Sequence, residues 1–175
     1  MRILFVSGTA VGGSASSTRE LAAALAARGH AVGLLARVAT APRRWMLQHR
    51  LTNAAVAREG SWLAAPLAGA AARIGRRSRV VRTETFREWS CILVENALAA
   101  VCAEFRPEVV VASSIGRMAW RSVRADLAAA GIPSVLYMRE ESSIGHLEVS
   151  DAPPDLLLAN AHQHEAAARA AGFTA

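Results

Sequence analysis

The sequence predicts an α/β domain with a doubly wound, mostly parallel sheet. Short apolar runs alternate with longer amphipathic stretches, and glycines stand where several of those stretches end. Apolar runs of this kind are typical of strands buried on both faces, and their alternation with helices predicts parallel strands joined by helical crossovers. The chain has 175 residues, a length that can bury a substantial core, so we expect a single domain over residues 1–175.

The N-terminal part predicts a strand, a helix and a second strand. The first strand is the apolar run over residues 3–6, and the second is the run over residues 30–37. Between them, Ser17 to Glu20 fit the capping box that opens many helices, and Gly29 is placed to end that helix. This βαβ unit is the usual building block of a parallel sheet.

The same alternation returns in the second half of the chain. Each apolar run there is followed by a glycine-terminated or proline-flanked stretch with helical spacing. We expect strands over residues 106–114, 132–140 and 156–160, and helices over residues 117–130 and 161–171.

Residues 42–105 differ in character and predict a helical insertion after the second strand. We expect two shorter helices over residues 45–57 and 62–74, and one long helix over residues 83–105. In the long helix, Phe86 and Trp89 begin a stripe of apolar residues at helical spacing.

Charge and cysteine content predict a cytoplasmic protein with an anionic partner. The net charge is +6, and all 20 basic residues are arginine, which favours anionic ligands or surfaces without choosing among them. Cys91 and Cys102 fall in the same predicted helix, about 16 Å apart along its axis and too far for a disulfide. The apolar stretch at the N-terminus is too short for a signal peptide or a membrane span.

A glycine-rich stretch, SGTAVGGSASS over residues 7–17, links the first strand to the first helix. Glycines at the start of a helix let a phosphate or a sugar approach the backbone N–H groups closely. The spacing does not fit the dinucleotide fingerprint G-x-G-x-x-G, and the chain has no lysine for a P-loop. The alternative is a loop whose glycines only form a turn.

Four segments occur in order along the chain: VGGSASSTRELAAALAARGHAV, RPEVVVASS, AGIPSVLYMRE and PDLLLANAHQHEAAARAAGF. Together they resemble the N-terminal, Rossmann-like domain of family-4 glycosyltransferases with the two-domain GT-B fold. The resemblance implies glycosyl transfer from a nucleotide-diphosphate sugar, with a sugar or lipid-linked acceptor bound by this domain and the donor bound by a C-terminal domain. We expect that C-terminal domain to be supplied in cis or in trans, no tightly bound cofactor, and no activity from these 175 residues alone.

The resemblance also implies a set of site residues. The positions of a frequent His-Asp pair in the family fall on Arg139 and Glu140, and we expect these two to be the catalytic pair. Arg139 is a fixed cation that can stabilise a leaving diphosphate but cannot transfer protons; the alternative is a surface ion pair of Arg139 with a neighbouring glutamate. The positions of a frequent His-x-His motif fall on Val111 and Ser113.

Further residues expected to bind the acceptor or a donor phosphate follow strands or begin helices. For the serines among them, turn formation is the alternative, and for the asparagine it is a helix cap. These residues are Gly12, Gly13, Ser14, Ser113, Ser114 and Asn160.

The predicted insertion combines tryptophans with a cluster of arginines. This combination suits an element that binds the anionic inner face of a membrane, and the alternative is a pair of helices packed on the sheet with a solvated arginine face. We expect no nucleic-acid binding, because no recognised motif accompanies the charge. The candidate membrane residues are Trp45, Trp62, Arg73, Arg76, Arg77 and Arg79.

Two other functions remain as alternatives, and a metal site is not expected. A non-catalytic partner subunit would expose an apolar face to a second polypeptide. A self-contained nucleotide-binding domain is disfavoured by the missing fingerprint and by Arg37, which stands where an acidic residue would end the second strand. His162 and His164 are two residues apart on a predicted helix and point in different directions.

Overall fold

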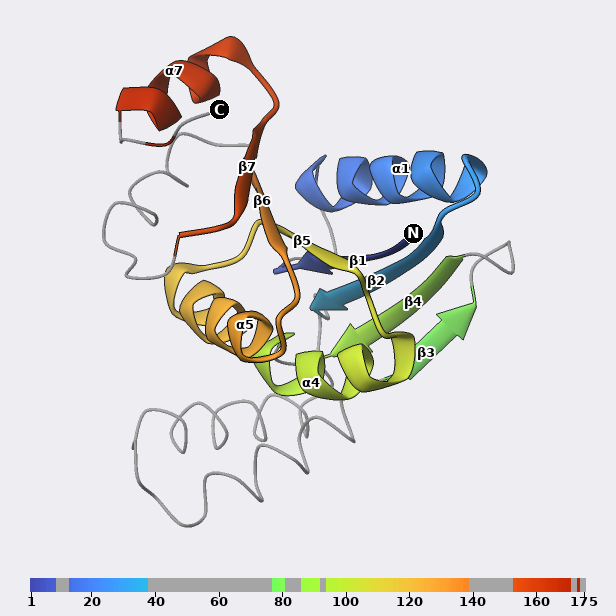
Figure 1. The fold of residues 1–175 in the computed structure, drawn as a ribbon. Helices are drawn as coiled ribbons and strands as arrows, with labels where there is room; N and C mark the ends of the chain where they lie inside the picture. Colours follow the sequence, from blue (N-terminus) through green and yellow to red (C-terminus); the bar gives the residue numbers. More distant parts are fainter. Residues whose placement is uncertain are drawn as a thin grey trace, which may run out of the picture.

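The computed structural model describes residues 1–8, 13–37, 77–80, 86–91, 94–138, 153–170 and 173. These residues form a sheet with helices on both faces, α1 on one and α4 and α5 on the other (Figure 1). The elements are β1 (Arg2–Ser7), α1 (Gly13–Ala27), β2 (Ala31–Arg37), β3 (Arg77–Val80), β4 (Phe86–Cys91), α4 (Val94–Phe105), β5 (Val109–Ser113), α5 (Arg117–Ala129), β6 (Ser134–Met138), β7 (Leu156–Ala159) and α7 (His162–Ala170).

The sheet has the strand order β3-β4-β2-β1-β5-β6-β7. Six of these strands are parallel, and β3 is added antiparallel to β4 at one edge. From β1 the chain first moves toward β4 and then crosses to β5 on the other side, so the direction reverses between β1 and β5. This order is that of the Rossmann fold, and it confirms the predicted α/β, mostly parallel architecture.

Side chains alternate along the central strands β4, β2, β1, β5 and β6 and supply two separate cores. In β1, Ile3 and Phe5 pack with Ala22 and Ala26 of α1, whereas Leu4 packs in the cluster on the opposite face. That opposite cluster joins the sheet to α4 and α5. Its largest fully buried members are Leu4, Val6, Leu35, Trp89, Leu98, Val101, Trp120 and Leu127.

The predicted long helix over residues 83–105 is wrong in its first half, because Phe86–Cys91 form strand β4. Phe86 packs on the α1 side, and Trp89 packs on the α4 side. The two charged neighbours follow the same alternation: Glu88 pairs with Arg19 of α1 at 3.1 Å, and Arg87 pairs with Glu104 of α4 at 3.8 Å. Burial on both faces of a central sheet therefore overrides the helical spacing of the apolar residues.

Strands β3 and β4 also show that the expected insertion is not wholly helical and that the two cysteines lie in different elements. Cys91 lies in β4 and Cys102 in α4, so they do not share one helix, although both are free thiols as expected. Residues 77–80, which lie between the second and third helices expected in the insertion, form strand β3. The two shorter helices expected over residues 45–57 and 62–74 lie outside the described residues.

Helix α1 begins at Gly13, four residues before the predicted capping box. The Ser17 hydroxyl donates to the Gly13 carbonyl oxygen at 2.9 Å, and the Thr18 hydroxyl donates to the Ser14 carbonyl oxygen at 2.8 Å. Both residues are therefore inside the helix, bonded one turn back along it. The glycine-rich stretch is accordingly part helix and not only a loop.

Candidate functional site

The candidate site is the reversal point of the sheet, at the carboxyl ends of β1 and β5. We call this region the switch-point site and define it by Gly8, by Ser113 to Gly116, and by the first turns of α1 and α5. Ligands of open α/β sheets bind outside the carboxyl ends of the strands at such a point. The sequence placed Gly13, Ser14, Ser113 and Ser114 in the site, and the structure assigns all four to this end of the sheet.

Gly8 brings the chain after β1 directly against the chain after β5. Its backbone N–H donates to the Ser113 carbonyl oxygen at 3.1 Å. A Cβ atom on Gly8 would lie 2.0 Å from the Ser114 carbonyl oxygen, which no side chain could tolerate. Ser114 has a φ of 50°, a conformation that is uncommon for a residue with a side chain. The two connections are thus held together backbone to backbone.

Three hydroxyl groups lie buried beneath this contact. Ser7 and Ser113 are direct cross-strand partners and are 2% and 0% exposed. Thr18 of α1 is also 0% exposed, and its hydroxyl is hydrogen-bonded to that of Ser113 at 3.1 Å. Ser113 therefore anchors α1 to the sheet. Its neighbour Ser114 is only half-buried.

Thr18 is the residue of this region that the sequence analysis missed. Thr18 lies in an apparent capping box, which suggested a position at the start of the helix. It instead lies on the buried face of α1. The signal that could have found it is the spacing of the small residues Ala15, Ala22 and Ala26, since Thr18 continues the same buried stripe.

The start of α5 presents backbone N–H groups without a side-chain cap. Gly116 is the N-cap residue, with extended backbone angles and no side-chain hydrogen bond to the helix. The first turn contains no acidic residue, nor does that of α1. A Cβ atom on Gly116 or Gly13 would meet no atom within 4 Å. The uncapped N–H groups and the helix dipole together favour an anionic ligand at α5.

Asn160 lies at the carboxyl end of β7, which is separated from β5 by β6. Its side-chain oxygen lies 2.5 Å from Nδ1 of His164, a residue that is 6% exposed. The asparagine thus contacts a buried histidine one turn into α7. At the spacing of neighbouring strands, about 10 Å separates β7 from β5, so Asn160 is at the same edge of the sheet as Ser113 but not beside it.

Several predicted site residues lie outside the described residues. These are Gly12, the pair Arg139 and Glu140, and the membrane candidates Trp45, Trp62, Arg73 and Arg76. The remaining two, Arg77 and Arg79, are in β3, at the opposite edge of the sheet from β7.

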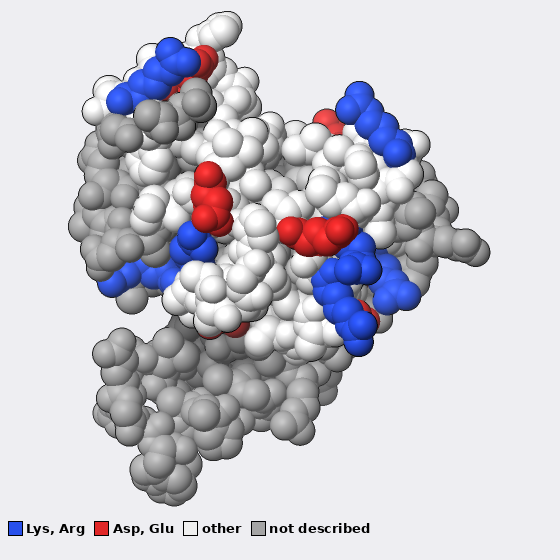
Figure 2. Space-filling model, in the orientation of Figure 1, with Lys and Arg blue, Asp and Glu red and all other residues white. Residues whose placement is uncertain are grey.

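Charged groups on the described surface are distributed in pairs. In the face shown in Figure 2, arginines and acidic residues lie side by side, and the described residues form no continuous basic patch on it. Ion pairs among the described residues include Arg124 with Asp155 at 2.9 Å and Arg169 with Glu165 at 2.6 Å. Positive charge from the described residues is therefore not concentrated on the face in Figure 2.

Neither metal binding nor thiol chemistry is supported within the part of the chain that the structure describes. No three His, Cys, Asp or Glu side chains are grouped there to hold a metal ion. Burial raises the pKa of Cys91 to about 12 and that of Cys102 to about 11, so both thiols stay protonated and weakly nucleophilic at neutral pH. No helix among the described residues has the length and apolar content needed to cross a membrane.

Comparisons of the chain with protein-family models, with curated proteins and with solved structures returned no match. The sheet order, the reversal between β1 and β5, and the helices on both faces identify the fold. This is a Rossmann-like α/β domain.

Proposed function

We propose that this domain is the acceptor-binding half of a nucleotide-sugar-dependent glycosyltransferase, with its ligand at the switch-point site. The observation that carries the proposal is the uncapped start of α5 beside the contact of Gly8 with Ser114. Backbone N–H groups in this arrangement suit the phosphate or the hydroxyl groups of a sugar derivative. The sequence resemblance to GT-B enzymes supplies the reaction class.

The same region argues against a complete dinucleotide-binding enzyme. A dinucleotide site needs glycines spaced as G-x-G-x-x-G in the first loop and an acidic residue at the end of β2 that binds the ribose hydroxyls. The glycines at positions 8, 12 and 13 do not have that spacing. This chain has Arg37 at the end of β2. We therefore place the nucleotide of the donor on a second domain, supplied in cis or in trans.

In this proposal Arg139 and Glu140 perform the chemistry. In sequence they directly follow β6, the neighbour of β5. A permanently charged guanidinium stabilises the negative charge that develops on a leaving nucleoside diphosphate. A lipid-linked acceptor would explain the tryptophans and arginines of residues 45–79, which we propose to contact an anionic membrane surface at its cytoplasmic face.

The proposal is tested by following backbone amide resonances during titration with glucose 1-phosphate, UDP-glucose and NAD. We expect shifts at Gly8, Ser114 and Gly116 with the sugar phosphate, and no binding of NAD tighter than about 100 µM. Micromolar binding of NAD would instead indicate a complete nucleotide-binding enzyme. Absence of shifts at the switch-point site with either sugar compound would contradict the proposal.

A matched pair of variants isolates the anionic part of the ligand. Gly116→Asp and Gly116→Asn both provide a side-chain cap for α5 and differ only in charge. We expect the sugar phosphate to bind about tenfold more weakly to the aspartate variant than to the asparagine variant. Equal affinities would show that the ligand does not approach the α5 N-terminus with its phosphate.

A further inference from the structure

Among the described residues, strand β7 is the last strand of the sheet, and its sequence Leu-Leu-Leu-Ala carries no charge. Leu156 is 48% exposed and Leu158 is 39% exposed; apart from Met1, they are the only exposed large hydrophobic residues among those described. The strand at the opposite edge, β3, has two arginines in four residues. Charges on edge strands prevent pairing with other chains, and β7 lacks this protection.

We propose that β7 is a dimer interface, at which it pairs antiparallel with β7 of a second copy across a two-fold axis. An outer sheet edge offers backbone N–H and C=O groups to another strand, so its partner must itself be an extended segment. The apolar sequence requires that segment to be apolar. The β7 strand of a second copy meets both conditions and closes the assembly at two chains.

The leucine spacing fits such a pairing. Leu156 and Leu158 point to the same face as Val135 and Tyr137, because each is the direct cross-strand partner of one of these residues in β6. A two-fold axis through Leu157 places Leu156 of each copy opposite Leu158 of the other copy. Four leucines that are exposed in the single chain then cover one another on one face of the continuous sheet.

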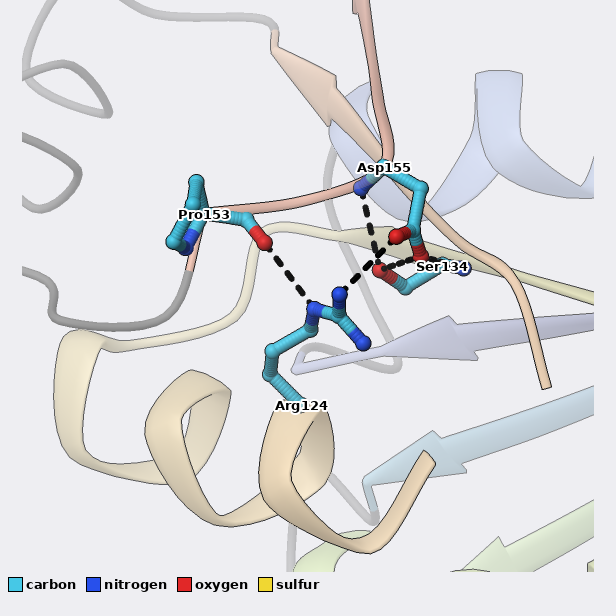
Figure 3. Close-up of polar contacts among 4 residues, drawn as sticks. All are labelled: Arg124, Ser134, Pro153 and Asp155. Atoms are coloured by element: carbon cyan, nitrogen blue, oxygen red, sulfur yellow. Dashed lines mark hydrogen bonds and ion pairs between the residues drawn. The ribbon is translucent and has the colours of Figure 1, made fainter. Parts of the chain in front are cut away.

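Contacts on the opposite face of β7 and at its start hold the strand in its extended conformation. Little conformational entropy therefore has to be lost when it pairs with a second copy. Leu157 packs against the small cluster formed by Met138 and Ala168. At the start of the strand, Arg124 donates to the Pro153 carbonyl oxygen and to Asp155, both at 2.9 Å, and Asp155 accepts from the Ser134 N–H at 2.7 Å (Figure 3). Preorganisation lowers the entropic cost of association. Because the strand is short, the dimer is expected to be weak and concentration-dependent.

The proposed interface does not overlap the switch-point site. It lies on the outer edge of β7, and β6 stands between β7 and β5 in the sheet. Sedimentation velocity of the chain between about 5 µM and about 500 µM tests it directly. We expect a reversible monomer–dimer equilibrium in this range, weakened at least about tenfold by Leu158→Lys, because the lysine enters the interface twice. The matched control is Ala23→Lys, at an exposed position of α1, which should leave the equilibrium unchanged.

A monomer at every concentration overturns the proposal, and so does a dimer that Leu158→Lys, still folded by circular dichroism, does not weaken. Cysteine cross-linking tests the register in a Cys102→Ala background. A mixture of Leu156→Cys and Leu158→Cys chains should form a disulfide-linked dimer faster than Leu156→Cys chains alone, because only the mixture places the two cysteines opposite each other. Equal rates would overturn the two-fold pairing.

Discussion

Gly8 and Ser114 meet backbone to backbone: a Cβ atom added to Gly8 would lie 2.0 Å from the Ser114 carbonyl oxygen. The contact joins the carboxyl ends of β1 and β5, which are adjacent in the sheet although far apart in the chain. It sets the distance between the loop that follows β1 and the loop that follows β5 at the switch-point site.

Gly8→Ala should therefore destabilise the domain by about 2–4 kcal/mol, because the methyl group can be accommodated only by separating the two backbones. Urea denaturation followed by circular dichroism measures the loss. The control is Gly13→Ala, since a Cβ atom at Gly13 meets nothing within 4 Å; its effect should stay within about 0.5 kcal/mol. Equal stability of the two variants would mean that Gly8 is not in contact with Ser114.

The buried hydroxyls of Thr18 and Ser113 should be energetically coupled. Thr18→Val leaves the Ser113 hydroxyl buried without this partner and should cost about 1–2 kcal/mol, and Ser113→Ala should have a similar effect. When both hydroxyls are removed, neither is left unsatisfied, so the double variant should lose about 1 kcal/mol less than the sum of the single losses. A double-mutant cycle in urea gives this difference, and strict additivity would show that the hydroxyls do not interact.

The ion pair at the start of β7 should make stability depend on pH. The pKa of Asp155 lies below its ordinary value of 3.8, mainly because its carboxylate accepts a hydrogen bond from the Ser134 backbone N–H, with the Ser134 hydroxyl and Arg124 adding to the effect. A depressed pKa contributes stability that is present above the unfolded-state value, about 3.9, and is lost as the pH falls through the folded-state value.

Asp155→Asn should accordingly be less stable than the parent protein at pH 7 by about 0.5–1 kcal/mol, since the amide cannot replace all of the carboxylate's hydrogen bonds and solvent screens this half-exposed group. The difference should shrink as the pH falls below about 4, through the depressed folded-state pKa of Asp155. Urea midpoints at several pH values test this. Glu165→Gln, at a surface pair with Arg169, serves as the control and should change stability by less than about 0.5 kcal/mol at pH 7. If the difference in stability between Asp155→Asn and the parent protein did not change with pH, the pKa of Asp155 would not be depressed in the folded state.

The sequence predicted the strands and helices in which apolar content and helical amphipathicity agree with the final burial. Strand β4 was missed because Phe86 and Trp89 are three residues apart, a spacing that suits one face of a helix. In the sheet these two side chains pack in the cores on opposite faces. The sequence alone does not show this, because it depends on where α1 and α4 pack. The region of the proposed site was anticipated only in part for a similar reason. Ser113 and Ser114 lie at the end of a clear strand, whereas Thr18 lies on a helix whose start was placed four residues too late.

The central position of β1 bears on how the domain folds. Arg2 and Glu108, at the other end of the β1–β5 pairing, are hydrogen-bonded although 106 residues separate them. Closing a loop of this length is entropically costly and slow compared with forming the local β1–α1–β2 unit. Gly8 can meet Ser114 only once that loop has closed. During synthesis, this contact can form only after β5 has left the ribosome, so binding of the proposed ligand there would report that both halves of the sheet have joined.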